Sequence, residues 1–155
     1  MKKKLVASFI LVFWAGFVSA ISFLEAWLKF KAPGITLPLG LGIGKLVFTA
    51  MNRTEWVLLA LFIFAVVYTR RRLQIIGKTS AILFFTLLIL LSLQTFWFLP
   101  ELNQRADLII AGQAPEDSLA HLFYGLAEVI KVLSLIALAF ATQQTQTINN
   151  RNLNV

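Results

Sequence analysis

Residues 79–99 have the sequence TSAILFFTLLILLSLQTFWFL, in which no side chain is charged. As a helix, this segment rises about 30 Å, which matches the hydrocarbon core of a bilayer. Pro100 and Glu101 are expected to end the helix. Trp97 lies near that end, where aromatic residues meet the membrane interface. The segment therefore predicts a transmembrane helix over 79–99.

The composition of the whole chain also indicates a membrane protein. Of the 155 residues, 59% are hydrophobic and 14% are charged, and the mean hydropathy is +0.81. A single soluble core of this size could not bury so much apolar surface. The chain has no cysteine, which excludes disulfides and thiolate metal sites. The net charge of +7 does not indicate nucleic-acid binding, because the cations lie mostly at the ends of apolar runs.

The first span is expected over residues 5–28. It follows three lysines at positions 2–4 and stays uncharged through Leu24. The triplet Val18-Ser19-Ala20 could also be the cleavage site of a signal peptide, which is the alternative interpretation. The apolar pattern continues beyond this triplet, which favours a retained membrane helix.

Glycine and proline are concentrated between the first and second spans, in residues 33–44. Two prolines and four glycines predict that the segment 33–51 is irregular and is either interfacial or re-entrant, packed on the bundle. Asn52 and Glu55 have the spacing of a capping box, so the second helix is expected over 53–70. The alternative is a helix that begins near Leu39.

The last helix is expected over residues 118–141, with Asp117 or Ser118 as its cap. Residues 101–117 form a polar connector with some helical character. The tail 142–155 is rich in Gln, Asn and Thr and is expected to be disordered. The predicted fold is all-α: a four-helix transmembrane bundle, with residues 1–141 as one domain.

Four spans place both termini on the same side of the membrane. The cations divide eight to five between the two sides, which favours N-in, C-in topology in a bacterial cytoplasmic (inner) membrane. The predicted cytoplasmic cations are Lys2, Lys3, Lys4, Arg70, Arg71, Arg72, Lys78 and Arg151. The other side would hold Lys29, Lys31, Lys45, Arg53 and Arg105.

Four polar residues of the last helix share one stripe. His121, Tyr124, Glu128 and Lys131 are spaced i, i+3, i+7 and i+10. An ionisable residue in the bilayer costs about 2.5–3.5 kcal/mol on insertion scales, so the stripe should face the bundle interior or a wet cavity. Two interpretations stay open: an ion pair that locks the bundle, or a ligand site.

The other polar candidates lie in the same outer half of the bilayer under this topology. Together with the stripe they could line one outward-facing pocket. These further candidates are Glu25, Lys29, Lys45, Arg53 and Glu55. Glu25 and Lys29 also have the i, i+4 spacing of an ion pair. No catalytic residue, metal site or cofactor is assigned, because neither a nucleophile nor a metal-binding motif accompanies His121 or Glu128.

Three functions follow from these features, in this order. The first is binding or passage of a small polar or amphiphilic ligand through the outward pocket. The second is an accessory or structural role in a larger membrane complex, with a membrane-protein partner or a second copy of the chain. The third is an intramembrane enzyme. The expected partners are thus the lipid bilayer, a small ligand or lipid, and another membrane protein.

Short motifs resemble a known membrane family. They are Trp14-Ala15-Gly16 with Phe23, the glycine-containing stretch before Lys45-Leu46-Val47-Phe48, Leu99-Pro100 followed by Arg105, and His121 with Tyr124. Together they resemble the four-helix family that includes animal transmembrane protein 205 and bacterial domain-of-unknown-function relatives. The resemblance implies a four-helix membrane fold but no particular activity.

Overall fold

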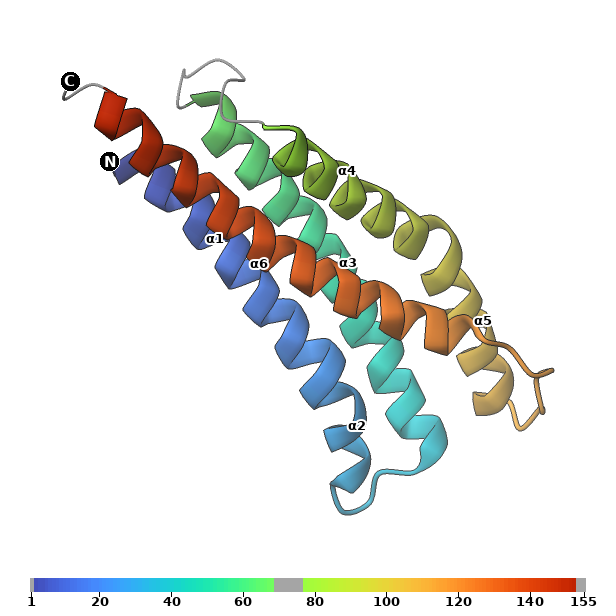
Figure 1. Ribbon diagram of the computed structural model, residues 1–155. Coiled ribbons are helices and arrows are strands. Elements are labelled where there is room, and N and C mark those ends of the chain that lie inside the picture. The colour runs from blue at the N-terminus through green and yellow to red at the C-terminus, as the bar shows by residue number, and fades with distance from the viewer. Residues whose placement is uncertain (1, 69–76, 153–155) are drawn as a thin grey trace.

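The computed structural model describes the backbone of residues 2–68 and 77–152 and the side chains of 6–68 and 77–143. Every regular element in these ranges is a helix, and the long helices pack as a bundle (Figure 1). Four of the described helical segments are long and apolar enough to cross a membrane: Val6–Lys31, Leu37–Tyr68, Lys78–Ile110 and Ala120–Gln143. The all-α, four-span architecture predicted from the sequence is therefore confirmed.

The first span is a continuous helical rod with changes of pitch. It consists of α1 (Lys2–Ser19), the π-helix η1 (Ala20–Glu25), α2 (Ala26–Leu28) and the 3₁₀ turn η2 (Lys29–Lys31). A short turn follows, in which Gly34 has a φ of 82°. That left-handed conformation favours glycine, because a Cβ would crowd the backbone.

The second span, α3 (Leu37–Tyr68), runs without a break. The predicted helix start near residue 53 is therefore wrong, and the alternative start near Leu39 is close to the observed one. Pro38 is tolerated because it lies in the first turn, where its missing N–H has no helical partner. Gly40 is needed for packing, since a Cβ there would lie 2.1 Å from the Phe30 ring.

The third span also continues further than expected. It consists of α4 (Lys78–Leu93), the π-helix η3 (Gln94–Phe98) and α5 (Leu99–Ile110), and its path bends at η3 (Figure 1). Pro100 does not end the helix, because it falls in the first turn of α5, directly after the wider π turn. The helix ends instead at Ile110, two residues before Gly112, which has a φ of 76°. The N–H of Gln113 donates to the carbonyl of Leu108 at 2.9 Å, as in a Schellman motif.

The fourth span, α6 (Ala120–Asn152), is the longest helix of the described chain. Ser118 caps it as predicted: its Oγ accepts the Ala120 N–H at 3.1 Å and donates to Glu101 at 2.7 Å. A disordered tail was expected over 142–155; α6 continues through Asn152, so residues 142–152 are helical, and residues 153–155 lie outside the described range. The cations predicted at positions 70–72 lie outside the described residues.

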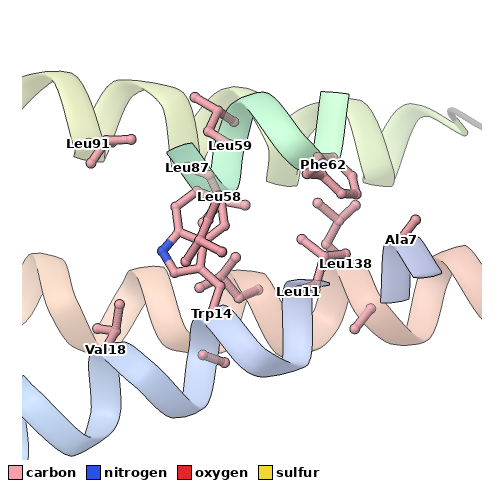
Figure 2. Packing of buried hydrophobic residues seen from close by; sticks show 13 residues of the cluster. Ala7, Leu11, Trp14, Val18, Leu58, Leu59, Phe62, Leu87, Leu91 and Leu138 are labelled. Carbon is pink, nitrogen blue, oxygen red and sulfur yellow. The ribbon is translucent and has the colours of Figure 1, made fainter. Parts of the chain in front are cut away.

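The helices meet around a continuous apolar core. The first helix packs on α6 and α3, while α4 packs on α6 and α5 packs on α3. Trp14 and Leu11 of α1 are completely buried, and Leu58, Leu87 and Leu138 reach the same cluster from the other helices (Figure 2). Both termini lie at one end of the bundle (Figure 1). We call the opposite end, which holds the turns at residues 32–36 and 111–119, the distal end.

The outer surface of the bundle is apolar. Large side chains such as Phe9, Leu46 and Phe96 are 70%, 74% and 78% exposed. Contiguous exposed apolar surface on this scale is atypical of soluble monomers. The exposed side chains are therefore suited to contact with lipid, and the polar groups buried between the helices become the candidates for function.

Candidate functional site

A charged cluster lies at the centre of the bundle, and we call it the charge centre. The Lys131 Nζ lies 2.6 Å from Glu55 Oε1 and 3.1 Å from Glu128 Oε1. It also donates to Gln94 Oε1 at 2.6 Å. The Gln94 amide donates to Glu128 Oε1 at 2.7 Å, and the Trp14 indole donates to Glu55 Oε1 at 2.9 Å. All five residues have no exposed surface.

Each long helix contributes to this cluster for a local reason. Glu128 and Lys131 are one turn apart on the inner face of α6, as the predicted stripe requires. Gln94 is the first residue of η3, and a π turn rotates the side chains relative to a regular helix. Glu55 lies on the inner face of α3 among buried leucines.

The charge centre contains two carboxyl groups and one ammonium group. Glu55 Oε2 and Glu128 Oε2 are buried and accept no hydrogen bond from any described residue. Each Oε1, in contrast, accepts two donors. Bringing charges into a low-dielectric interior is costly unless they are paired and fully hydrogen-bonded. The charge centre thus joins α1, α3, η3 and α6. It retains two carboxyl oxygens that accept no hydrogen bond from a described residue.

A cavity of about 580 Å³ lies at the distal end of the bundle, and we call it the distal cavity. Its walls are mainly apolar and include Phe30, Leu41, Phe48 and Leu102. Six polar side chains also line it: Ser22, Lys29, Lys45, Asn103, His121 and Tyr124. This volume is within the range of small-molecule sites, which typically combine apolar walls with a few polar groups.

The cations of the distal cavity are held by neighbouring acids. Lys29 lies 3.2 Å from Glu25, which confirms the predicted i, i+4 pair. Its ammonium is also 5.4 Å and 5.5 Å from the ring centroids of Phe30 and Phe48. Lys45 lies 2.5 Å from Asp107 of α5. Neither acid lines the cavity, so its lining carries the two ammonium groups and no carboxylate.

Tyr124 lies between the distal cavity and the charge centre. It lines the cavity and precedes Glu128 by one turn on α6. Its ring meets Phe48 edge-to-face, with centroids 5.6 Å apart. Its hydroxyl is buried and has no hydrogen-bond partner in the part of the chain that the structure describes. The same side chain also lies beside the Glu128 carboxyl group, so Tyr124 connects the cavity with the charge centre.

A second, shallower hollow of about 320 Å³ lies on the side of the bundle, and we call it the lateral crevice. Thr49, Asn52, Arg53 and Trp56 line it from α3, and Thr95 and Asn103 face them. The Trp56 indole donates to Thr95 at 2.9 Å, and the Thr95 hydroxyl lies 3.1 Å from Asn52 Oδ1. Several polar side chains thus gather at a hollow on an otherwise apolar surface.

The nine candidate residues do not line a single pocket. Glu55, Glu128 and Lys131 lie in the charge centre. Lys29, Lys45, His121 and Tyr124 line the distal cavity, with Glu25 held beside it by Lys29. Arg53 lines the lateral crevice. Binding of a ligand at any of these places stays a prediction.

The sequence assigned no role to Gln94 or Asn103, and it assigned Asn52 only the role of a helix cap. Gln94 is an amide within the long uncharged run 79–99, where a buried polar group needs a hydrogen-bond partner. That was the only sequence signal for a role of Gln94. Among the described side chains, no group of three or more His, Cys, Asp or Glu residues could hold a metal ion. The three sites offer a ligand hydrogen-bonding groups and charged groups.

No protein-family model, curated protein or solved structure matches the chain.

Proposed function

We propose that this multi-pass membrane protein binds a small amphiphilic molecule in the distal cavity. The observation that carries the proposal is the combination of apolar walls with two ammonium groups, a phenol and an imidazole in one cavity of about 580 Å³. An apolar chain would contact the walls, and an acidic headgroup would meet the ammonium groups.

The direction of the stripe on α6 supports ligand binding over a subunit role. Glu128 and Lys131 have no exposed surface, and Tyr124 is only 4% exposed. A partner chain that used this stripe would need it on the outer surface of the bundle. His121 is exposed and lines the cavity, so the stripe leads from the distal surface into the interior.

Oleate is a direct probe of this proposal. We expect the delipidated protein to retain one oleate in native mass spectrometry, and Ala106→Phe to lower the retained fraction about tenfold or more, because the ring fills the space beside Ala106 in the cavity. Ala50→Phe is the matched control, since Ala50 is exposed on α3. Retention of oleate by a folded Ala106→Phe variant would contradict the proposal.

The proposed location is a bacterial cytoplasmic membrane with both termini inside. Topology reporters fused after Arg72 and after Val155 should read cytoplasmic, and a reporter fused after Pro115 should read external. The expectation follows from the bias of Lys and Arg between the two sides. A cytoplasmic signal at Pro115 would reverse the proposed orientation.

A further inference from the structure

The exposed face of α3 contains one charged residue in the middle of an apolar stripe. Leu46, Val57 and Phe64 are 74%, 57% and 64% exposed, and Arg53 lies on the same face and is also exposed. Arg53 is halfway along α3. No acidic side chain within the described ranges forms an ion pair with it. An unpaired guanidinium is costly at this depth, so an anion is expected to meet it.

The lateral crevice beside Arg53 offers a second unused donor. Asn52 is 4% exposed, and its Nδ2 has no hydrogen-bond partner among the described residues. Two neighbouring polar groups are already engaged: Thr49 donates to the Lys45 carbonyl at 2.6 Å, and Trp56 donates to Thr95. Because the free groups of the crevice include a cation and an amide donor, it is suited to an acceptor that carries negative charge.

The position of the crevice indicates how an anion would reach it. The Lys45–Asp107 pair is partly exposed to solvent and precedes Arg53 by eight residues, or about 12 Å along the helix. The long Arg53 side chain can extend toward the depth of the Lys45–Asp107 pair, while its aliphatic stem stays in the apolar layer. Pro100 lines the crevice at the start of α5, just after the bend at η3.

We propose that the lateral crevice binds the acidic headgroup of a membrane amphiphile, a phosphate or a carboxylate. Arg53 neutralises the charge, and the Asn52 amide donates a hydrogen bond. The acyl chains lie along the apolar stripe of α3. This site is separate from the distal cavity, although Leu99 and Asn103 line both hollows.

Native mass spectrometry of the full chain in detergent tests this site. The probes are phosphatidylglycerol and phosphatidylcholine with identical acyl chains. We expect the wild-type chain to retain phosphatidylglycerol in preference, and Arg53→Gln to reduce that preference about tenfold. Asn52→Asp should reduce it as well, because a carboxylate replaces the amide donor. Arg105→Gln is the matched control, since Arg105 lines neither hollow.

Four outcomes decide the inference. An unchanged preference in a folded Arg53→Gln variant, or no preference in the wild-type chain, would overturn it. Inorganic phosphate that displaces phosphatidylglycerol would assign the site to a free anion, whereas failure to displace it would assign the site to the lipid. Ala106→Phe should leave this preference intact, so failure of the distal-cavity proposal can be distinguished from failure of this one.

Discussion

Replacement of Lys131 by methionine should cause the largest loss of stability of any substitution of a charged residue in the charge centre. The change removes the only cation that contacts Glu55 and Glu128 among the described residues, at 2.6 and 3.1 Å. Both carboxyl groups are completely buried. Removing one partner of a buried ion pair typically costs about 3–5 kcal/mol. The free energy of unfolding, measured by denaturation of the protein in mixed micelles, should fall by this amount.

A matched control separates the effect of losing a buried ion pair from the effect of losing an exposed one. Lys45→Met also breaks an ion pair, but Lys45 and Asp107 have side chains that are 33% and 59% exposed. Exposed pairs contribute about 0–1 kcal/mol, so this variant should unfold almost like the wild-type protein. Equal losses from the two substitutions would show that Lys131 reaches water, contrary to the structure.

The rescue experiment depends on Glu55. From the sequence, Glu128→Leu combined with Lys131→Met is expected to restore stability, because both members of the pair become apolar. In the structure, Glu55 lies closer to Lys131 than Glu128 does, so this double variant leaves one buried carboxyl unpaired. The variant that should recover most of the stability is Glu55→Gln, Glu128→Gln, Lys131→Met. If this triple variant also retains oleate, the charge centre only stabilises the bundle. If the variant is stable but loses oleate, the charge centre is part of the ligand-binding site.

The main features of the fold could be predicted because each depends on neighbouring residues in sequence. The uncharged run 79–99 is long enough to span a bilayer in any context. The stripe from His121 to Lys131 and the Glu25–Lys29 pair follow from helical periodicity alone. These local patterns do not depend on how the helices pack.

The errors arose where packing overrides a local pattern. Asn52 and Glu55 have the spacing of a capping box, yet neither caps a helix. The Asn52 side chain lies against Thr95 at 3.1 Å, and Glu55 pairs with Lys131 at 2.6 Å. Both partners are distant in sequence, so a short window cannot distinguish a cap from an interhelical contact. Pro100 was likewise expected to end a helix that continues through a π turn.

The charge centre itself could be predicted only in part. The sequence places Glu128 and Lys131 on one face of a helix, but it does not indicate which other helix faces them. Gln94 reaches the centre at the start of a π turn, and sequence periodicity does not predict a change of helical pitch. The grouping of Glu55, Gln94 and Trp14 around Lys131 therefore required the structure.

Trp14→Ala should be the most damaging substitution on the first helix. Trp14 is completely buried among side chains of α3, α4 and α6 (Figure 2), and its indole donates to Glu55 at 2.9 Å. Within a bilayer, helix association depends on close packing, so the cavity left by the ring is not offset by collapse of the core. The expected loss in the free energy of unfolding is about 3–5 kcal/mol, measured in mixed micelles.

Two further variants resolve the contributions of volume and hydrogen bonding at Trp14. Trp14→Phe keeps an aromatic ring but removes the donor to Glu55, so it should cost about 1 kcal/mol beyond the loss of ring volume. Phe9→Ala removes a ring that is 70% exposed on the same helix and should change stability by less than about 0.5 kcal/mol. Similar losses from Phe9→Ala and Trp14→Ala would mean that α1 does not pack with Trp14 facing the bundle interior. This packing requires a graded series of losses in the free energy of unfolding. Trp14→Ala should lose the most, and Phe9→Ala should lose almost nothing.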